Sequence, residues 1–182
     1  LPVSYAIKEQ FPKAHITWVV EPPAKPLLEL DPCVDAILAF HKKEFRSLGG
    51  FLSHFAPFRR AIQARRYDAV LDLQGLLKSA VIAYLADAPV KRGMCNMREG
   101  SSLVSKPVLG AHAHGHIVAR YLDVARAIGC AVREVRFPLE IPAKVEQQAR
   151  QLFYQAGGNM GNAYVCLAVG ANWPNKRWNA ES

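Results

Sequence analysis

The sequence predicts an α/β protein built from doubly wound units, with the first unit lacking its opening strand. Short apolar runs alternate with amphipathic helical segments, as in parallel sheets covered by helices. The chain begins with a helical segment (4–11) and then a strand (15–20), whereas a doubly wound unit normally begins with a strand. We therefore expect the first strand and its loop upstream of Leu1. A new apolar run at 164–169, after the glycine-rich stretch 157–162, indicates a second unit.

Each expected element follows from local pattern. The expected helices have an amphipathic spacing of apolar residues, and they are 4–11, 24–30, 51–66, 80–85, 117–128 and 143–156. The expected strands are short runs, most of them rich in β-branched and aromatic residues, and they are 15–20, 34–40, 67–73, 90–94 and 164–169. The predicted division is a first domain over 1–142, a connecting helix and linker over 143–162, and the start of a second domain over 163–182.

Composition limits the classes of function. Hydrophobic residues make up 51% and charged residues 21%, which is typical of a globular protein. The net charge of +8 favours polyanionic or phosphorylated partners, but no zinc-finger or RNA-recognition pattern supports nucleic acid. The four cysteines have no C-x-x-C spacing, so neither a zinc site nor a disulfide framework is predicted. No apolar run approaches the roughly 20 residues of a membrane-spanning helix.

The last apolar run leads into a candidate anion site. Gly170, Ala171 and Asn172 form a short loop between the expected strand and a helix start near Asn179. Backbone N–H groups at such a position can bind a phosphate, and Lys176 adds a positive charge nearby. An ordinary turn with a solvated lysine has the same pattern, so both interpretations stay open.

A second candidate site follows the strand 67–73. Gln74, Gly75 and Lys78 lie between this strand and the next helix. Ligands of open α/β sheets bind at the carboxyl ends of the strands. The alternative is that Gln74 only caps backbone groups and that Lys78 is solvated.

Three histidines, at positions 112, 114 and 116, suggest a metal site at first sight. Nothing in the sequence fixes a carboxylate or thiol ligand beside them, so no metal is predicted. His116 is instead expected at the start of the helix 117–128, with Arg120 one turn further on the same side.

Several segments together resemble one family. They are YDAVLDLQGLLKSA (67–80), HIVARY (116–121), VGANWPNKRW (169–178) and the opening residues 1–21. This set resembles the lipopolysaccharide heptosyltransferases of glycosyltransferase family 9, and within them the heptosyltransferase I group. The resemblance implies a GT-B fold, with two Rossmann-like domains and the active site between them.

The resemblance also implies a reaction and its partners. Such enzymes transfer heptose from ADP-heptose to a Kdo sugar of the lipid A inner core, with inversion and without a metal or other cofactor. The amino-terminal domain binds the anionic glycolipid acceptor, and the carboxyl-terminal domain binds the nucleotide-sugar. The implied location is cytoplasmic, peripheral to the inner face of the inner membrane.

Residue roles carry over by position. Lys176 matches the lysine that contacts the donor diphosphate, and Gly170, Ala171 and Asn172 match the phosphate-side loop. Hydroxyl residues often stand where Ala171 and Asn172 stand here, which leaves the contact to backbone N–H groups. The residues that match acceptor-side positions are Lys42, Lys43, Arg46, Gln74, Lys78, His116 and Arg120.

No catalytic residue is assigned, because the aspartate expected to act as the general base lies upstream of Leu1. The 182 residues alone are therefore expected to be inactive. Two other functions fit the same sequence: a GT-B enzyme that uses another nucleotide-sugar, and a non-catalytic α/β module that binds nucleotides or polyanions.

Overall fold

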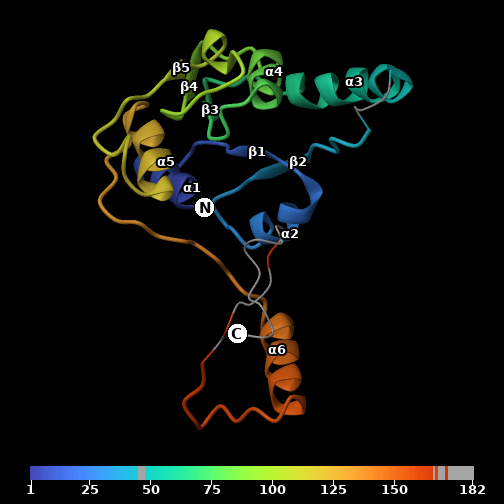
Figure 1. Ribbon diagram of the computed structural model, residues 1–182, viewed down its shortest axis with the longest axis vertical. Helices are drawn as coiled ribbons and strands as arrows, with labels where there is room; N and C mark the ends of the chain where they lie inside the picture. The colour runs from blue at the N-terminus through green and yellow to red at the C-terminus, as the bar shows by residue number, and fades with distance from the viewer. Residues whose placement is uncertain (45–47, 166, 168–170, 172–182) are drawn as a thin grey trace. The chain divides into compact units, whose positions relative to one another are not determined.

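The computed structural model describes residues 1–44, 48–165, 167 and 171, without the side chains of 48, 51 and 52. The chain forms two compact units, Leu1–Glu140 and Ile141–Ser182. The first unit holds the sheets and most of the helices (Figure 1). The finer division of the second unit that the sequence suggested stays a prediction.

Parallel strands form the centre of the first unit, so the predicted α/β class is confirmed. Strand β1 (Thr17–Val20) pairs with β2 (Ala36–Ala39) in a two-stranded parallel sheet. A second parallel sheet has the order β3-β4-β5. Its strands are Ala69–Asp72, Val90–Gly93 and Lys106–Pro107.

Helices and short 3-10 turns connect the strands. Their bounds are α1 Pro2–Gln10, η1 Pro22–Ala24, α2 Lys25–Leu28, α3 Leu48–Gln63, α4 Leu77–Leu85, η2 Ser101–Leu103 and α5 Ile117–Arg126. Helix α5 ends at Arg126, two residues before the predicted end, and the turn after it reaches Gly129, whose φ of +98° is a left-handed conformation that suits glycine.

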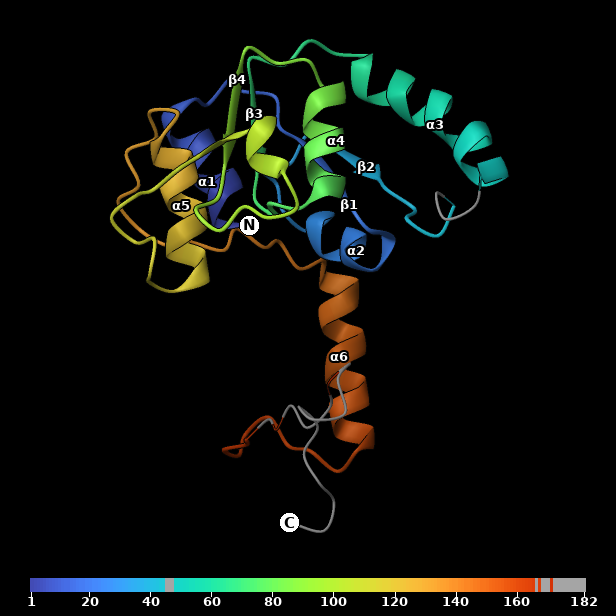
Figure 2. The same ribbon diagram turned by 45° about the horizontal axis from the view of Figure 1, so that its top comes forward.

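The main core lies where α1 packs on α5, which lie side by side in Figures 1 and 2. Apolar side chains from both helices meet there, and part of β3 packs against them. The buried members are Val3, Ala6, Leu122, Ala125 and Cys130, and the partly buried members include Ile7, Leu71, Leu73, Val118 and Tyr121. This packing fixes β3 against the helical layer.

Most differences from the predicted elements concern their ends. Helix α4 begins at Leu77 rather than at position 80, because the Ser79 hydroxyl accepts a hydrogen bond from the N-cap Leu76 N and Glu99 accepts one from Leu77 N. The short strand β5 was not predicted, since two residues carry no readable alternation.

The second unit contains α6 (Ala143–Gln155), as predicted. The Tyr164 ring packs on Phe153 of this helix, with ring centroids 5.1 Å apart. The expected strand 164–169 is not present at Tyr164, Val165 and Leu167, and the other three positions lie outside the described residues. A parallel strand needs a paired neighbour for its backbone groups, and no described residue of this unit supplies one.

Candidate functional site

Three side chains from the carboxyl ends of different strands meet at one place. Glu21 follows β1, Lys42 follows β2, and Lys78 lies in the first turn of α4, after β3. The Lys42 Nζ atom is 3.2 Å from Glu21 Oε2, and the Lys78 Nζ atom is 4.0 Å from Glu21 Oε1. All three side chains are more than a third exposed, so these ion pairs add little stability. The cluster therefore presents two exchangeable cations at the strand ends.

A buried carboxylate shapes the loop beside this cluster. Asp72, the last residue of β3, is only 4% exposed. Its Oδ1 atom accepts hydrogen bonds from the backbone N–H groups of Gln74 (3.0 Å) and Gly75 (2.9 Å). Its Oδ2 atom accepts one from the Ser79 hydroxyl (3.0 Å). Asp72 thus joins the turn after β3 to the first turn of α4 and keeps Gln74 exposed at the tip.

Gly75 is required in this turn. Its φ is +67°, and a Cβ atom there would lie 3.2 Å from the backbone Cα of Met97. Its carbonyl accepts hydrogen bonds from Arg98 N (2.8 Å) and Ser101 Oγ (2.9 Å), so the segment after β4 is hydrogen-bonded to this turn. Any residue with a Cβ atom would be strained at this positive φ and would also lie too close to the backbone of Met97.

The amino end of α4 is already occupied by a carboxylate. Glu99 Oε2 accepts a hydrogen bond from Leu77 N at 3.0 Å. An external anion at this helix end would have to displace Glu99, so Lys78 is the group available for an anion here.

The basic segment after β2 is only partly described. Lys43 is exposed and has no ion-pair partner among the described residues. Glu44 lies 3.7 Å from His41 Nδ1 and 3.7 Å from His54 Nε2. Arg46 lies outside the described residues.

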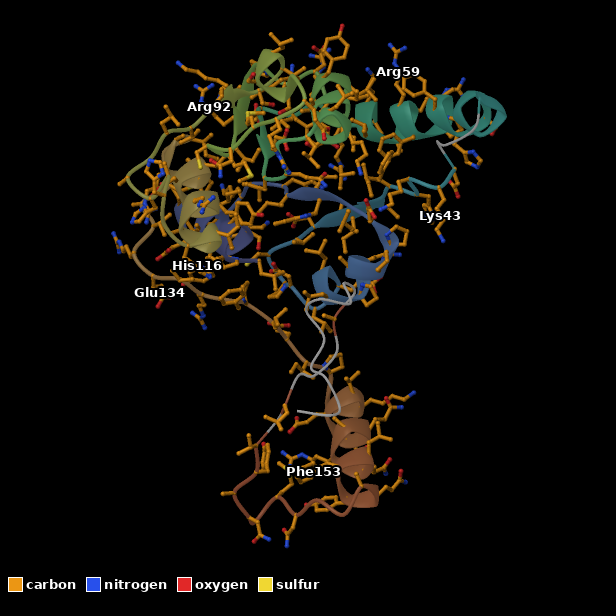
Figure 3. All side chains as sticks on the ribbon, viewed as in Figure 1. Lys43, Arg59, Arg92, His116, Glu134 and Phe153 are labelled. Carbon is orange, nitrogen blue, oxygen red and sulfur yellow. The ribbon has the colours of Figure 1, made fainter. Side chains whose placement is uncertain are left out.

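His116 and Arg120 support the start of α5. His116 Nδ1 accepts a hydrogen bond from Val118 N (3.3 Å), as an N-cap does, and Arg120 Nε donates to Gly115 O (2.8 Å). Figure 3 shows His116 on α5, well separated from Lys43. The structure therefore does not place this pair with the Glu21 cluster, and their role at an acceptor site stays a prediction.

His112 is held by a buried aspartate. Asp123 on α5 is 3% exposed and accepts hydrogen bonds from His112 N (2.8 Å), His112 Nδ1 (2.9 Å) and Arg126 Nη1 (2.8 Å). Burial raises the pKa of Asp123, but the hydrogen bonds from His112 and Arg126 outweigh burial and hold the pKa below its usual value. Within the described ranges, no group of three or more metal-ligating side chains could hold a metal ion.

The donor-side residues lie mostly outside the described ranges. These are Gly170, Asn172 and Lys176, while Ala171 is half-buried without regular secondary structure. Their roles stay predictions. In the part of the chain that the structure describes, no helix has the length and apolar character needed to cross a membrane.

Sequence reasoning missed Glu21 and Asp72. Each is an acidic residue directly at the carboxyl end of an apolar strand, which is a readable signal. The partners of Glu21 cannot be predicted from the sequence, because Lys42 and Lys78 come from other segments of the chain.

The fold and the strand-end cluster define an α/β protein with a polar site at the carboxyl edge of parallel strands. Residues 55–182 match the model of glycosyltransferase family 9 (heptosyltransferase), which is more than half of the chain. The chain belongs to this family. Among curated relatives, lipopolysaccharide heptosyltransferase 1 of Escherichia coli O18:K1:H7 (strain RS218 / NMEC) is 30% identical over 97 residues, which are 52% of this chain and 30% of the relative. The Salmonella typhimurium (strain LT2) protein of the same name is 29% identical over 97 residues, 52% of this chain and 31% of the relative.

Solved structures of family 9 enzymes are also similar to this chain. The E. coli heptosyltransferase WaaC with ADP superposes with a TM-score of 0.63 at 28% identity, covering 74% of this chain and 44% of that chain. A family 9 glycosyltransferase from Veillonella parvula DSM 2008 gives a TM-score of 0.77 at 20% identity over 99% of this chain and 51% of its own, which shows the fold. These matches support the GT-B type fold implied by the resemblance. The chain spans about half the length of these structures, or less, and the matched region is under a third of the curated relatives.

Proposed function

We propose that this chain is part of a heptosyltransferase of lipopolysaccharide biosynthesis, and that its first unit binds the acceptor. The proposed reaction transfers heptose from ADP-heptose to the Kdo-lipid A inner core, with inversion and without a metal. The observation that carries the proposal is the meeting of Lys42 and Lys78 around Glu21 in a chain of this family.

The cluster suits an anionic acceptor. The Glu21 carboxylate bridges the exposed ammonium groups of Lys42 and Lys78. A phosphate or carboxylate of the acceptor can take the place of Glu21 beside one or both of these lysines. Ion pairs at such exposure exchange at little cost. Gln74, held at the tip of the Asp72 turn, lies at the same strand-end edge and can donate or accept hydrogen bonds to sugar hydroxyls.

The donor side of the proposal depends on relatives. The E. coli WaaC structures are described with ADP and with ADP-2-deoxy-2-fluoro heptose. By the motif match, Lys176 and the backbone N–H groups of Gly170, Ala171 and Asn172 contact the leaving diphosphate. An inverting transfer passes through an oxocarbenium-like state, and without a metal these groups stabilise the departing negative charge.

The proposed location is the cytoplasmic face of the inner membrane. The acceptor is a glycolipid with an anionic head group, and the net charge of +8 favours association with anionic lipid surfaces.

Acceptor binding tests the proposal directly. The 182-residue chain is titrated with deacylated Kdo-lipid A in a calorimeter, beside the Lys42→Ala and Lys78→Ala variants. Each variant should weaken binding about tenfold, because one charge-assisted contact of about 1.4 kcal/mol is lost. Lys25→Ala is the matched control, since Lys25 is similarly exposed and its Nζ atom pairs with Glu29, at 3.4 Å, rather than with Glu21.

The alternatives give different outcomes. Equal affinity of the double variant Lys42→Ala/Lys78→Ala and the unmodified chain would reject the acceptor site. Binding of heparin as tight as that of the glycolipid, and equally weakened in all variants, would favour a general polyanion-binding module.

A further inference from the structure

A hollow of about 440 Å³ lies towards the amino-terminal ends of β4 and β5, within the usual range of about 300–1000 Å³ for small-molecule pockets. Its walls come from residues within 88–92 and 102–107. Strands β3, β4 and β5 are parallel, so this edge of their sheet is opposite the carboxyl-terminal edge that carries Lys78. Figure 3 also shows Arg92, which lines the hollow, well separated from Lys43. The hollow is therefore distinct from the Glu21 cluster.

The charge of this hollow is positive and is not neutralised by the protein. Lys91, Arg92 and Lys106 line it, and no acidic side chain does. Among the residues that the structure describes, none of these three cations has an ion-pair partner. Arg92 and Lys106 are register partners on neighbouring strands, which lie about 4.8 Å apart. Two like charges so close repel each other, and a bound anion would relieve the repulsion.

The guanidinium of Arg92 is held toward the hollow. Its Nη1 atom donates a hydrogen bond to Lys91 O at 3.3 Å. Gly93 O accepts from Val108 N on the β5 side, and backbone groups alternate along a strand, so the Lys91 carbonyl faces the same side. A guanidinium has five N–H donors, and within the described ranges this one makes no other hydrogen bond. Most of its donors are therefore available to a ligand.

Two further side chains suggest what else a ligand carries. Ser102 lines the hollow, and its hydroxyl can donate a hydrogen bond to an anion. Leu103 also lines it and is 91% exposed. One exposed leucine is ordinary on a protein surface, but beside three cations it suits a ligand with an apolar part next to its anionic group.

We propose that this hollow binds a phosphate ester, with Lys91, Arg92 and Lys106 around the phosphate and Leu103 against the apolar part of the ligand. A phosphate group offers several strong acceptor oxygens, and an arginine can bind two of them at once. The ester can belong to a soluble molecule or to the head group of a phospholipid, because both present the same group. The inference goes beyond the proposed function and does not depend on it.

Binding of sn-glycerol 3-phosphate to the 182-residue chain tests the site, with glycerol as the matched ligand that lacks the phosphate. The backbone amide resonances of Leu103 and Lys106 should shift in a nuclear magnetic resonance titration. Lys91→Ala and Lys106→Ala should each weaken binding about tenfold, because one charge-assisted contact is lost.

Two control variants should bind sn-glycerol 3-phosphate with unchanged affinity. Lys13→Ala is the matched control, since Lys13 is also exposed and outside the hollow, and it has no ion-pair partner in the described part of the chain. The double variant Lys42→Ala/Lys78→Ala separates this site from the proposed acceptor site. Loss of glycolipid binding in that variant, with sn-glycerol 3-phosphate binding intact, would show two independent sites.

Vesicles distinguish the two sources of the phosphate ester. Phosphatidylcholine vesicles with and without phosphatidylglycerol are mixed with the chain and sedimented. A phospholipid source predicts that Lys91→Ala, Lys106→Ala and Leu103→Ser all weaken binding to the vesicles that contain phosphatidylglycerol. A soluble source predicts that the two lysine variants weaken only the binding of sn-glycerol 3-phosphate. Either result supports the site.

Three results would overturn the proposal. The first is that sn-glycerol 3-phosphate binds no more tightly than glycerol. The second is that Lys13→Ala weakens binding as much as the variants of the hollow do, which would indicate attraction by net charge alone. The third is unchanged affinity in both Lys91→Ala and Lys106→Ala. Aggregation of Lys106→Ala together with that third result would show that this lysine only keeps the edge strand β5 from pairing with other chains.

Discussion

Replacing Asp72 by alanine should strongly destabilise the first unit and disturb the turn that carries Gln74. Asp72 is 4% exposed and accepts three hydrogen bonds, two from backbone N–H groups and one from Ser79. Alanine leaves those donors without their acceptor in a buried site. A hydrogen bond to a charged group contributes about 1.5–3 kcal/mol, and the three are not additive. We expect a loss of about 3 kcal/mol in the free energy of unfolding.

Urea unfolding followed by circular dichroism measures this loss. With a slope of about 2 kcal/mol per molar urea, the midpoint should fall by about 1.5 M. Asp72→Asn is the matched variant, because its amide oxygen still accepts from the backbone of Gln74 and Gly75, and it should cost about 1 kcal/mol. It also keeps the test valid if the alanine variant does not fold. Equal midpoints for the unmodified chain and both variants would refute the reasoning.

Three further predictions follow from other parts of the chain. Gly110→Ala should cost about 1–3 kcal/mol in thermal unfolding, because a Cβ atom would lie 2.4 Å from Asp123 Cγ, while Gly115→Ala meets only ordinary to mildly tight contacts and serves as the control. The hydrogen bonds to Asp123 hold its pKa below 3.8 in the folded chain, so their contribution to the free energy of unfolding is complete above about pH 4 and is lost as the pH falls through the folded pKa. Asp123→Asn should therefore flatten the acidic part of the curve of stability against pH, and an unchanged curve would contradict the prediction. In the full-length protein, Lys176→Ala should lower the rate of heptosyl transfer at least tenfold without changing the circular dichroism spectrum. Unchanged turnover would show that Lys176 is not part of the donor site.

Much of the fold was predictable because its signals are local. The run at 15–20 has β-branched and aromatic residues, and β1 forms within it at Thr17–Val20. The segment 117–128 has helical spacing and a glycine after it, and α5 forms at Ile117–Arg126. Element ends were less predictable. The start of α4 depends on Glu99, a residue from another loop.

The candidate site was predictable only in part. Lys78 was expected at the carboxyl end of a strand, and the family resemblance assigned Lys42 to the acceptor side; the structure brings both to one carboxylate. The resemblance also assigned His116 and Arg120 to the acceptor side, which stays a prediction, and in the structure these two residues support the start of α5. The sequence predicts which residues follow a strand, but it does not predict which of these residues from different strands come into contact.

The sequence by itself determined the kinds of elements, their order, the basic character of the surface and the family. Those features depend on residue types and on spacings of a few positions, which act within one turn or one strand. Only the tertiary structure decided that Glu21 joins Lys42 to Lys78. Such features depend on sheet order and register, which are fixed by packing between segments distant in the chain.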